Sequence, residues 1–112
     1  MRMYMFVLNC LPDPNKREYA DLSMCLAHIW VKADNENLAF EAAKNYAISY
    51  GWLPQQIEHA FDCTDADLSQ YHEDEVWLCR KAEQFGIAAD YIAAPKVPRD
   101  GITAYHLDLP KN

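Results

Sequence analysis

Residues 22–54 read LSMCLAHIWVKADNENLAFEAAKNYAISYGWLP. The first twelve positions alternate in side-chain size, which predicts a strand at 22–33 with two different apolar faces. One face carries Cys25, Ala27, Ile29 and Val31, and the other carries Met24, Leu26, His28 and Trp30. Asp34 or Asn35 then caps a helix that runs to about residue 50, with Gly51 as its C-terminal stop. The apolar stripe of this helix is rich in alanine, so we expect it to lie close against a sheet.

The segments on either side extend this unit. Residues 3–11 are apolar on both alternations, which is typical of a strand in the interior of a sheet. A connection of about ten polar residues suggests a long hairpin with the strand at 22–33. A third strand is predicted at 56–63, with Ile57, His59, Phe61 and Cys63 on one face. Strand, helix and strand then form a right-handed βαβ unit.

The C-terminal half adds a further helix and one or two strands. A second helix is expected within 65–85, beginning as late as Glu73 and stopped by Gly86. A fourth strand follows at 87–94, and 102–109 predicts a fifth strand at the edge. The sequence therefore predicts one α+β domain over 1–112, in the order β-β-α-β-α-β-(β). We expect a single layer of four to five mixed strands with two helices on one face, an arrangement that resembles the ferredoxin-like style.

Two short helices on one face would leave the other face of the sheet open. The small side chains of residues 22–33 suit the alanine-rich helix, so the larger set should point outward. The residues expected on this open face are Met24, Leu26, His28, Trp30 and Tyr4. Because exposed apolar patches mark interfaces, we expect a homodimer through this face. The alternative is that the C-terminal segment folds across it.

The net charge of −7 comes from one segment. No Lys or Arg lies between Lys44 and Arg80, while this stretch holds Glu58, Asp62, Asp65, Asp67, Glu73, Asp74 and Glu75. Phosphate backbones need the opposite sign, which argues against nucleic-acid binding and favours a basic protein partner.

No stretch approaches the ~18 apolar residues that cross a bilayer, so we expect no membrane association. The short apolar N-terminus lacks a small-residue cleavage site, which favours a cytoplasmic location.

The sequence offers two candidate chemistries, acid–base catalysis and zinc binding. His72 and Glu75 lie one turn apart on the second helix, where they could form a general acid–base pair, unless the helix begins later and leaves both at its end. His59 with Cys63, and Cys25 with His28, offer zinc-ligand types, but Cys25 and His28 point to opposite strand faces and no CxxC is present. We therefore expect four reduced core cysteines, no metal and no cofactor. Three glycines and no nucleophile motif leave enzymatic activity uncertain and less expected than binding.

Trp77 stands out as an aromatic residue opposite the apolar stripe of the second helix. Its neighbours on that polar face are Glu73, Arg80, Lys81 and Gln84. Trp and Arg are enriched at binding hot spots, so Trp77 is a candidate partner anchor. The alternative is that it packs under the C-terminal segment.

Paired strands, an alanine-rich helix ending in Gly51-Trp52 and an acidic later helix resemble many short bacterial domains, some of which are immunity proteins that neutralise toxins. The resemblance has no diagnostic motif and assigns no site residues. The leading expectation is a small acidic, non-catalytic protein-binding module of the immunity or inhibitor type. Its acidic segment would steer a basic partner and Trp77 would anchor it. The alternative is a small-molecule-binding or catalytic α+β dimer with a pocket at the open sheet face.

Overall fold

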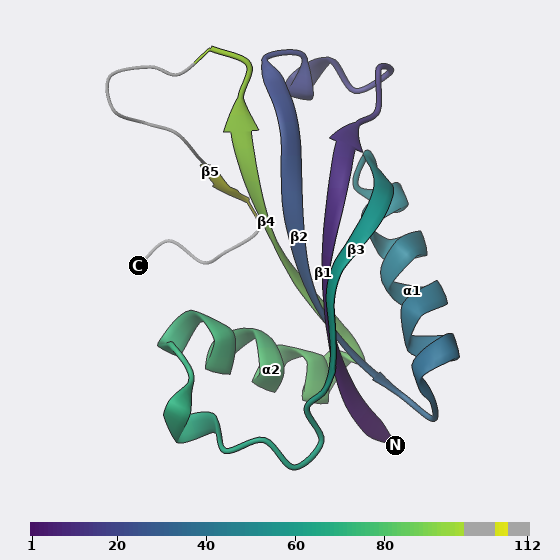
Figure 1. The fold of residues 1–112 in the computed structure, drawn as a ribbon, viewed down its shortest axis with the longest axis vertical. Helices are drawn as coiled ribbons and strands as arrows, with labels where there is room; N and C mark the ends of the chain where they lie inside the picture. Colours follow the sequence, from purple (N-terminus) through teal and green to yellow (C-terminus); the bar gives the residue numbers. More distant parts are fainter. Residues whose placement is uncertain (98–104, 108–112) are drawn as a thin grey trace.

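The computed structural model describes residues 1–97 and the backbone of 105–107, and its long strands form one antiparallel sheet (Figure 1). The strands are β1 (Arg2–Pro12), β2 (Leu22–Ala33), β3 (Trp52–Asp62), β4 (Ile87–Pro95) and the short β5 (Tyr105–Leu107). The helices are α1 (Glu36–Ser49) and α2 (Glu73–Phe85), with 3-10 turns η1 (Arg17–Tyr19) and η2 (Leu68–Gln70). None of the helices in this described part of the chain has the length and hydropathy to span a membrane.

The strand order is β3-β1-β2-β4-β5. This confirms the α+β class, the order of elements and the interior position of the first strand. β2 and β3 both pair antiparallel with β1, so they run parallel to one another with β1 between them. The prediction of mixed pairing was wrong, because β1 occupies the place between the two parallel strands and leaves every neighbouring pair antiparallel.

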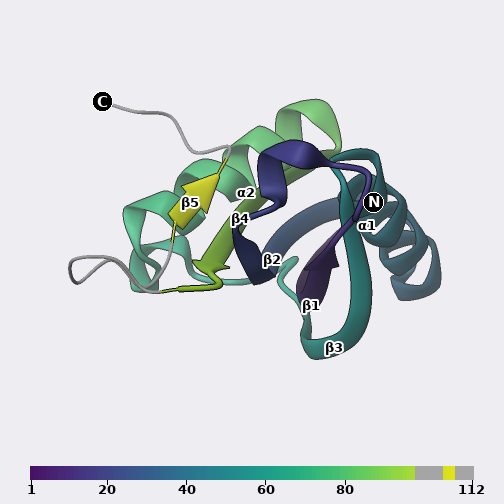
Figure 2. The ribbon, with the colours of Figure 1, turned by 90° about the horizontal axis from the view of Figure 1, so that it is seen from above.

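The two helices lie on opposite faces of the sheet, which corrects the expectation that both share one face (Figure 2). α1 packs against β1, β2 and β3, while α2 packs against β2 and β4. The handedness rule that motivated the prediction applies only when a crossover joins parallel strands. The rule applies to α1. It does not predict which face α2 covers, because α2 joins β3 to an antiparallel β4.

The face under α1 is filled with apolar side chains. Asn35 caps the helix by accepting a hydrogen bond from the backbone N–H of Leu38 at 2.9 Å, as the sequence suggested. Three alanines at helical spacing are fully buried against the sheet, namely Ala39, Ala43 and Ala47. Trp52 closes one end of this core, stacked on Tyr19 with ring centroids 4.5 Å apart. The small alanine side chains let the helix sit close to larger strand residues.

The face under α2 is only partly covered. α2 begins at Glu73 and ends at Gly86, whose φ of 91° is the left-handed conformation that favours glycine. Its apolar stripe covers Trp30 and Ala88 at one end of the sheet. Trp30 is 1% exposed and meets Tyr71 edge-on with ring centroids 5.9 Å apart. The rest of this face, towards the middle of the strands, lies beyond the helix.

A β-bulge in β3 changes which residues share a face. Val7 pairs with His59, but the next residue of β1, Leu8, pairs with Ile57, so Glu58 is an extra residue. His59 and Phe61 therefore lie on the α2 face, while Ile57 lies beside Leu8 and Phe40 on the α1 side. The prediction that Ile57 shares a face with His59 was wrong, because strict alternation fails at a bulge.

Candidate functional site

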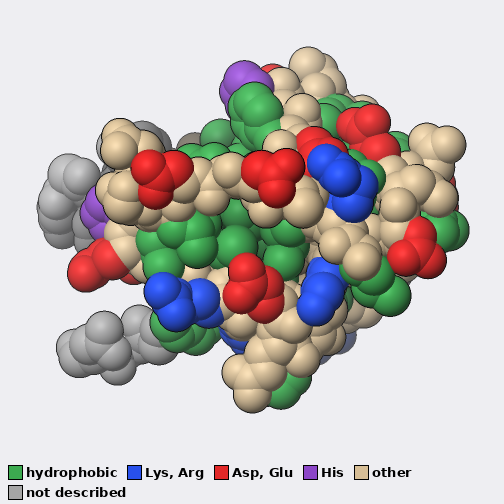
Figure 3. Space-filling view, turned by 90° about the horizontal axis from the view of Figure 1, so that it is seen from below, with side chains coloured by type: hydrophobic (Ala, Val, Ile, Leu, Met, Phe, Trp, Pro, Cys, Tyr) green, Lys and Arg blue, Asp and Glu red, His purple; other side chains and the backbone are tan. Residues whose placement is uncertain are grey.

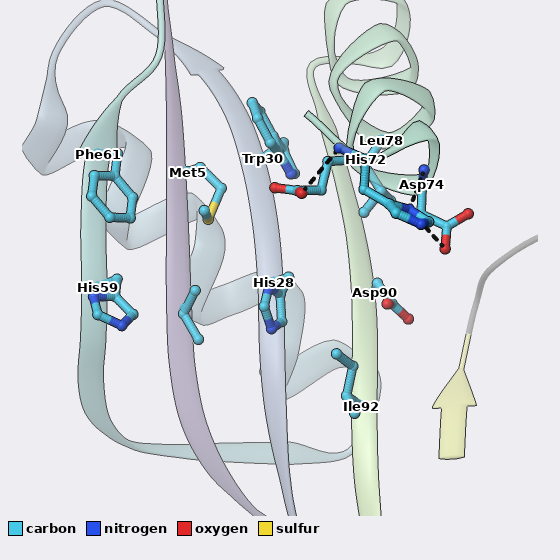
Figure 4. Close-up of a pocket in the computed structure, with 12 residues that line it drawn as sticks. Met5, His28, Trp30, His59, Phe61, His72, Asp74, Leu78, Asp90 and Ile92 are labelled. Carbon is cyan, nitrogen blue, oxygen red and sulfur yellow. Dashed lines mark hydrogen bonds and ion pairs between the residues drawn. The ribbon is translucent and has the colours of Figure 1, made fainter. Parts of the chain in front are cut away.

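A cavity of about 640 Å³ lies on the part of the sheet that α2 leaves uncovered (Figure 4). Its volume lies within the range of roughly 300–1,000 Å³ that is common for small-molecule sites. The side chains that line it come from four strands and the start of α2. They are Met5, Val7, His28, Trp30, His59, Phe61, His72, Asp74, Glu75, Leu78, Asp90 and Ile92.

The floor is built from rows that cross the sheet. One row runs His59, Val7, His28, Asp90, because each residue is the cross-strand partner of the next. The adjacent row runs Phe61, Met5, Trp30, Ala88 by the same pairing. Residues two apart on a strand point to the same face, so both rows face α2. The local alternation of four strands thus places polar side chains on an otherwise apolar floor.

The two histidines of the floor stand on either side of Val7. Two strand spacings separate their backbones, which is roughly 10 Å. His59 also stacks along its own strand on Phe61, with ring centroids 5.7 Å apart and planes 17° apart. A flat ligand resting on Val7 would therefore have an imidazole at each side.

The start of α2 supplies the polar wall of the cavity. The Nδ1 atom of His72 accepts the backbone N–H of Asp74 at 3.3 Å, and the Glu75 carboxylate accepts the backbone N–H of His72 at 3.4 Å. His72 Nδ1 also lies 3.7 Å from an Asp74 carboxylate oxygen. The two contacts of Nδ1 are alternatives, because a ring nitrogen accepts when neutral and pairs with a carboxylate when protonated. Negative charges at this helix end are favoured by its dipole.

This geometry corrects the expected His72–Glu75 acid–base pair. The helix begins after His72, so Glu75 contacts the His72 backbone and no side-chain contact between the two is shown. Of the two starts that the sequence allowed for this helix, α2 adopts the later one, at Glu73. The two residues act as a capping box and line the cavity beside it.

Asp90 ends the floor row on β4 and is 5% exposed. It is the one acidic residue in a strand that is otherwise small and apolar. Figure 4 shows it at the side of His28, with Ile92 next along the strand. Carboxyl groups are rarely buried unless they are paired, and ligand sites place a few polar groups among apolar ones.

The predicted open-face residues divide between the two sides of the sheet. Met24, Leu26 and His28 are half-buried on the α2 face, and His28 lines the cavity. Trp30 lies on that face but is covered by α2, so its predicted exposure was wrong. Tyr4 pairs with Val31 and is buried on the α1 face, because its position on β1 alternates with those of Met3 and Met5. The predicted cover by the C-terminal segment falls on 98–104 and 108–112, outside the described residues.

The acidic segment is broken up by local contacts. Asp62 pairs with the Arg2 guanidinium at 2.7 Å, which together with Thr64 lowers the pKa of Asp62 to about 2. Asp67 accepts hydrogen bonds from Ser69, and Glu58 accepts one from Asn9. Asp65 and Glu73 are exposed. On the face shown in Figure 3, acidic side chains are scattered with basic ones among them. A count of charges along the sequence does not show that folding places Arg2 beside Asp62.

Trp77 points away from the sheet on α2, as predicted from its position opposite the stripe. It is 36% exposed, and Lys81 Nζ lies 5.1 Å from the centroid of its ring. Phe85, about two turns beyond Trp77 on the same helix, is 67% exposed. These residues border a shallow hollow on the outer surface. A binding role for Trp77 stays a prediction.

The four cysteines are free and buried. Cys10 and Cys25 are cross-strand partners under α1, and contact with the Cys10 thiol together with burial raises the pKa of Cys25. Cys63 and Cys79 lie in the cluster under α2, where burial raises the pKa of Cys79 to about 11. Cys25 and His28 lie on opposite faces. Within 1–97 no group of three or more ligand-type side chains is arranged to hold a metal ion.

Sequence reasoning missed most of the cavity. His28 was placed on the right face, but His59 was considered only as a partner of Cys63, and Asp90 was not singled out. One available signal was a lone carboxylate within the apolar strand 87–94. The cross-strand register, which brings these residues into one row, is not visible in a single sequence.

Comparisons with known proteins add no relatives: the sequence matches no family model, and neither a curated protein nor a solved structure is significantly similar to it.

Proposed function

We propose that the protein binds a small organic molecule in the cavity on the α2 face of its sheet. The observation that carries the proposal is the combination of about 640 Å³ of space with an apolar floor and a few polar side chains. Small-molecule sites have this composition, in which apolar walls supply affinity and a few polar groups set orientation. A purely structural sheet face would be filled, as it is under α1.

Binding is favoured over covalent catalysis by the chemistry of the wall. Among the described residues that line the cavity there is no Ser, Thr, Cys or Lys. Imidazoles and carboxylates can move protons or orient a ligand, but a covalent route through the usual hydroxyl, thiol or amine nucleophiles has no group to begin it. The proposal therefore covers binding alone.

The test is a titration of the full chain with indole, a neutral aromatic probe, followed by backbone NMR. We expect the shifted amides to include those of His28, His59 and Ile92. Ile92→Trp should abolish the shifts by filling the cavity. Ile57→Trp is the matched control, because Ile57 lies on the other side of the sheet. Shifts confined to other surfaces, or equal loss in both variants, would count against the cavity.

The protein-binding function expected from the sequence is a second candidate, supported by the exposed pair Trp77 and Phe85 beside Lys81. Trp is among the residue types enriched at interface hot spots. We expect Trp77→Ala to remove protein partners that wild-type bait captures from the native host, while Ile48→Ala on the outer side of α1 does not. Capture that is equal for both variants would argue against Trp77 as an anchor.

The homodimer also stays a proposal, and it would use the same half-covered face. Light scattering coupled to gel filtration measures it directly. A mass of about 13 kDa, the mass of one chain, would contradict the dimer and leave the cavity open to solvent.

A further inference from the structure

The charged side chains that line the cavity indicate which class of small molecule it binds. This inference rests on the proposed function. Of the residues described around the cavity, none is Lys or Arg, whereas three are carboxylic acids: Asp74, Glu75 and Asp90. The remaining titratable lining groups are the imidazoles of His28, His59 and His72. Apart from these imidazoles, the described lining offers carboxylates and no lysine or arginine to a charged ligand.

An anionic ligand has no permanent counter-charge in this wall. A carboxylate or phosphate group would lie near Asp74 and Glu75, and like charges in a partly enclosed site repel strongly. A cationic ligand would instead meet two carboxylates at one end of the cavity. The electrostatic preference is therefore for a positive group.

The opposite side of the cavity suits an aromatic or apolar body. Phe61 is 49% exposed, and its ring continues the stack begun by His59. Met5 and Val7 form the apolar floor beside these rings. Ring faces attract cations as well as flat apolar groups, so they do not oppose a positive ligand.

We infer that the cavity selects a small organic cation, an amine joined to an aromatic or apolar body. The body lies over Val7 and Met5 between the two floor histidines. The ammonium group points to Asp74 and Glu75 at the start of α2. Figure 4 shows Phe61, His59 and Met5 on one side of this space and His72 and Asp74 on the other.

The experiment compares three probes that share one ring system: tryptamine, indole and indole-3-acetate, which are cationic, neutral and anionic near pH 8. Affinities are measured by NMR titration of the full chain at physiological salt. We expect tryptamine to bind about tenfold more tightly than indole-3-acetate, with indole between them. Equal affinities would overturn the charge preference while keeping the cavity. Tightest binding of the acid would overturn the preference outright.

Two variants locate the effect. Asp74→Asn combined with Glu75→Gln should remove the advantage of tryptamine over indole-3-acetate. Gln at the position of Glu75 still satisfies a capping box, so α2 should keep its start. Glu73→Gln is the matched control, because Glu73 lies on the same helical turn but outside the lining. An equal loss in the control would assign the effect to overall charge. Failure of all three probes to shift cavity amides would contradict the proposed function as well.

Discussion

The two faces of the sheet use the same strands for different purposes. Under α1, side chains from four strands and three helix alanines pack into a continuous buried cluster. Under α2, the buried cluster is smaller and lies at one end of the sheet, with the cavity beside it. The difference follows from where each helix lies: α1 packs mainly against β2 and β3 and also against β1, whereas α2 packs mainly against β4 and β2. One face can therefore supply most of the stability while the other keeps room for a ligand.

The composition of each face agrees with this division. The buried α1 cluster consists of aliphatic, aromatic and cysteine side chains and contains no charged residue. The α2 face places two histidines and a buried carboxyl in one row. Of these three side chains only Asp90 is buried, while His28 is half-buried and His59 is exposed, so the row presents polar groups to the cavity and not to a closed core.

The largest expected effect tests which face stabilises the fold. Ile29→Ala removes a fully buried side chain from the α1 face and should lower the free energy of unfolding by about 2–5 kcal/mol. Ile92→Ala makes the same chemical change at a half-buried position in the cavity and should cost clearly less, because the site is already open. Urea unfolding of both variants measures the difference. Equal losses of unfolding free energy in the two variants would contradict the conclusion that the α1 face supplies most of the stability.

A smaller effect tests how closely α1 lies on the sheet. Ala43→Met inserts a larger side chain where no space exists and should destabilise the protein by about 1–3 kcal/mol. Ala42→Met is the control, because Ala42 is the exposed neighbour on the same helix. Thermal unfolding would show a lower Tm for Ala43→Met alone. If Ala43→Met left the Tm unchanged, the α1 face would be less tightly packed than the burial of Ala43 indicates.

The smallest effect concerns the surface contact at the end of β3. Arg2 is the main cause of the lowered pKa of Asp62, about 2 in the folded chain against an ordinary value of 3.8. Because the pKa of Asp62 is lower in the folded chain than in the unfolded chain, the ionised carboxylate stabilises the fold at neutral pH. This contribution is lost as the pH falls from about 4 to about 2. Arg2→Gln should therefore flatten the loss of stability between pH 5 and pH 2, whereas Arg17→Gln in the η1 turn should not. Parallel pH profiles of wild type and Arg2→Gln would contradict the pairing.

Several parts of the fold were predictable because their signals are local. Asn35 and the helix stop at Gly86 are recognised from hydrogen-bonding capacity and from glycine's tolerance of positive φ. Strand periodicity likewise located β1, β2 and β4 to within a few residues. The start of α2 was ambiguous because an acidic stretch before a helix suits either a first turn or a capped loop.

The candidate site was predictable only in part. A pocket at a half-open sheet face and the participation of His28 were both expected from the sequence. His59 and Phe61 changed faces relative to Ile57 because of the bulge in β3, and no periodic pattern reveals a bulge in advance. Tyr4 and Trp30 were misplaced because the choice of covered face depends on where the helices dock.

The sequence by itself determined the type and order of the elements and some of their ends, since these depend on hydrophobic period, caps and turns within a few residues. Only the tertiary structure decided that the two helices take opposite faces, that Arg2 meets Asp62, and that His59, His28 and Asp90 form one row. Those features depend on strand register and docking between residues far apart in the chain. The free energies that select them belong to the assembled sheet and not to any single segment.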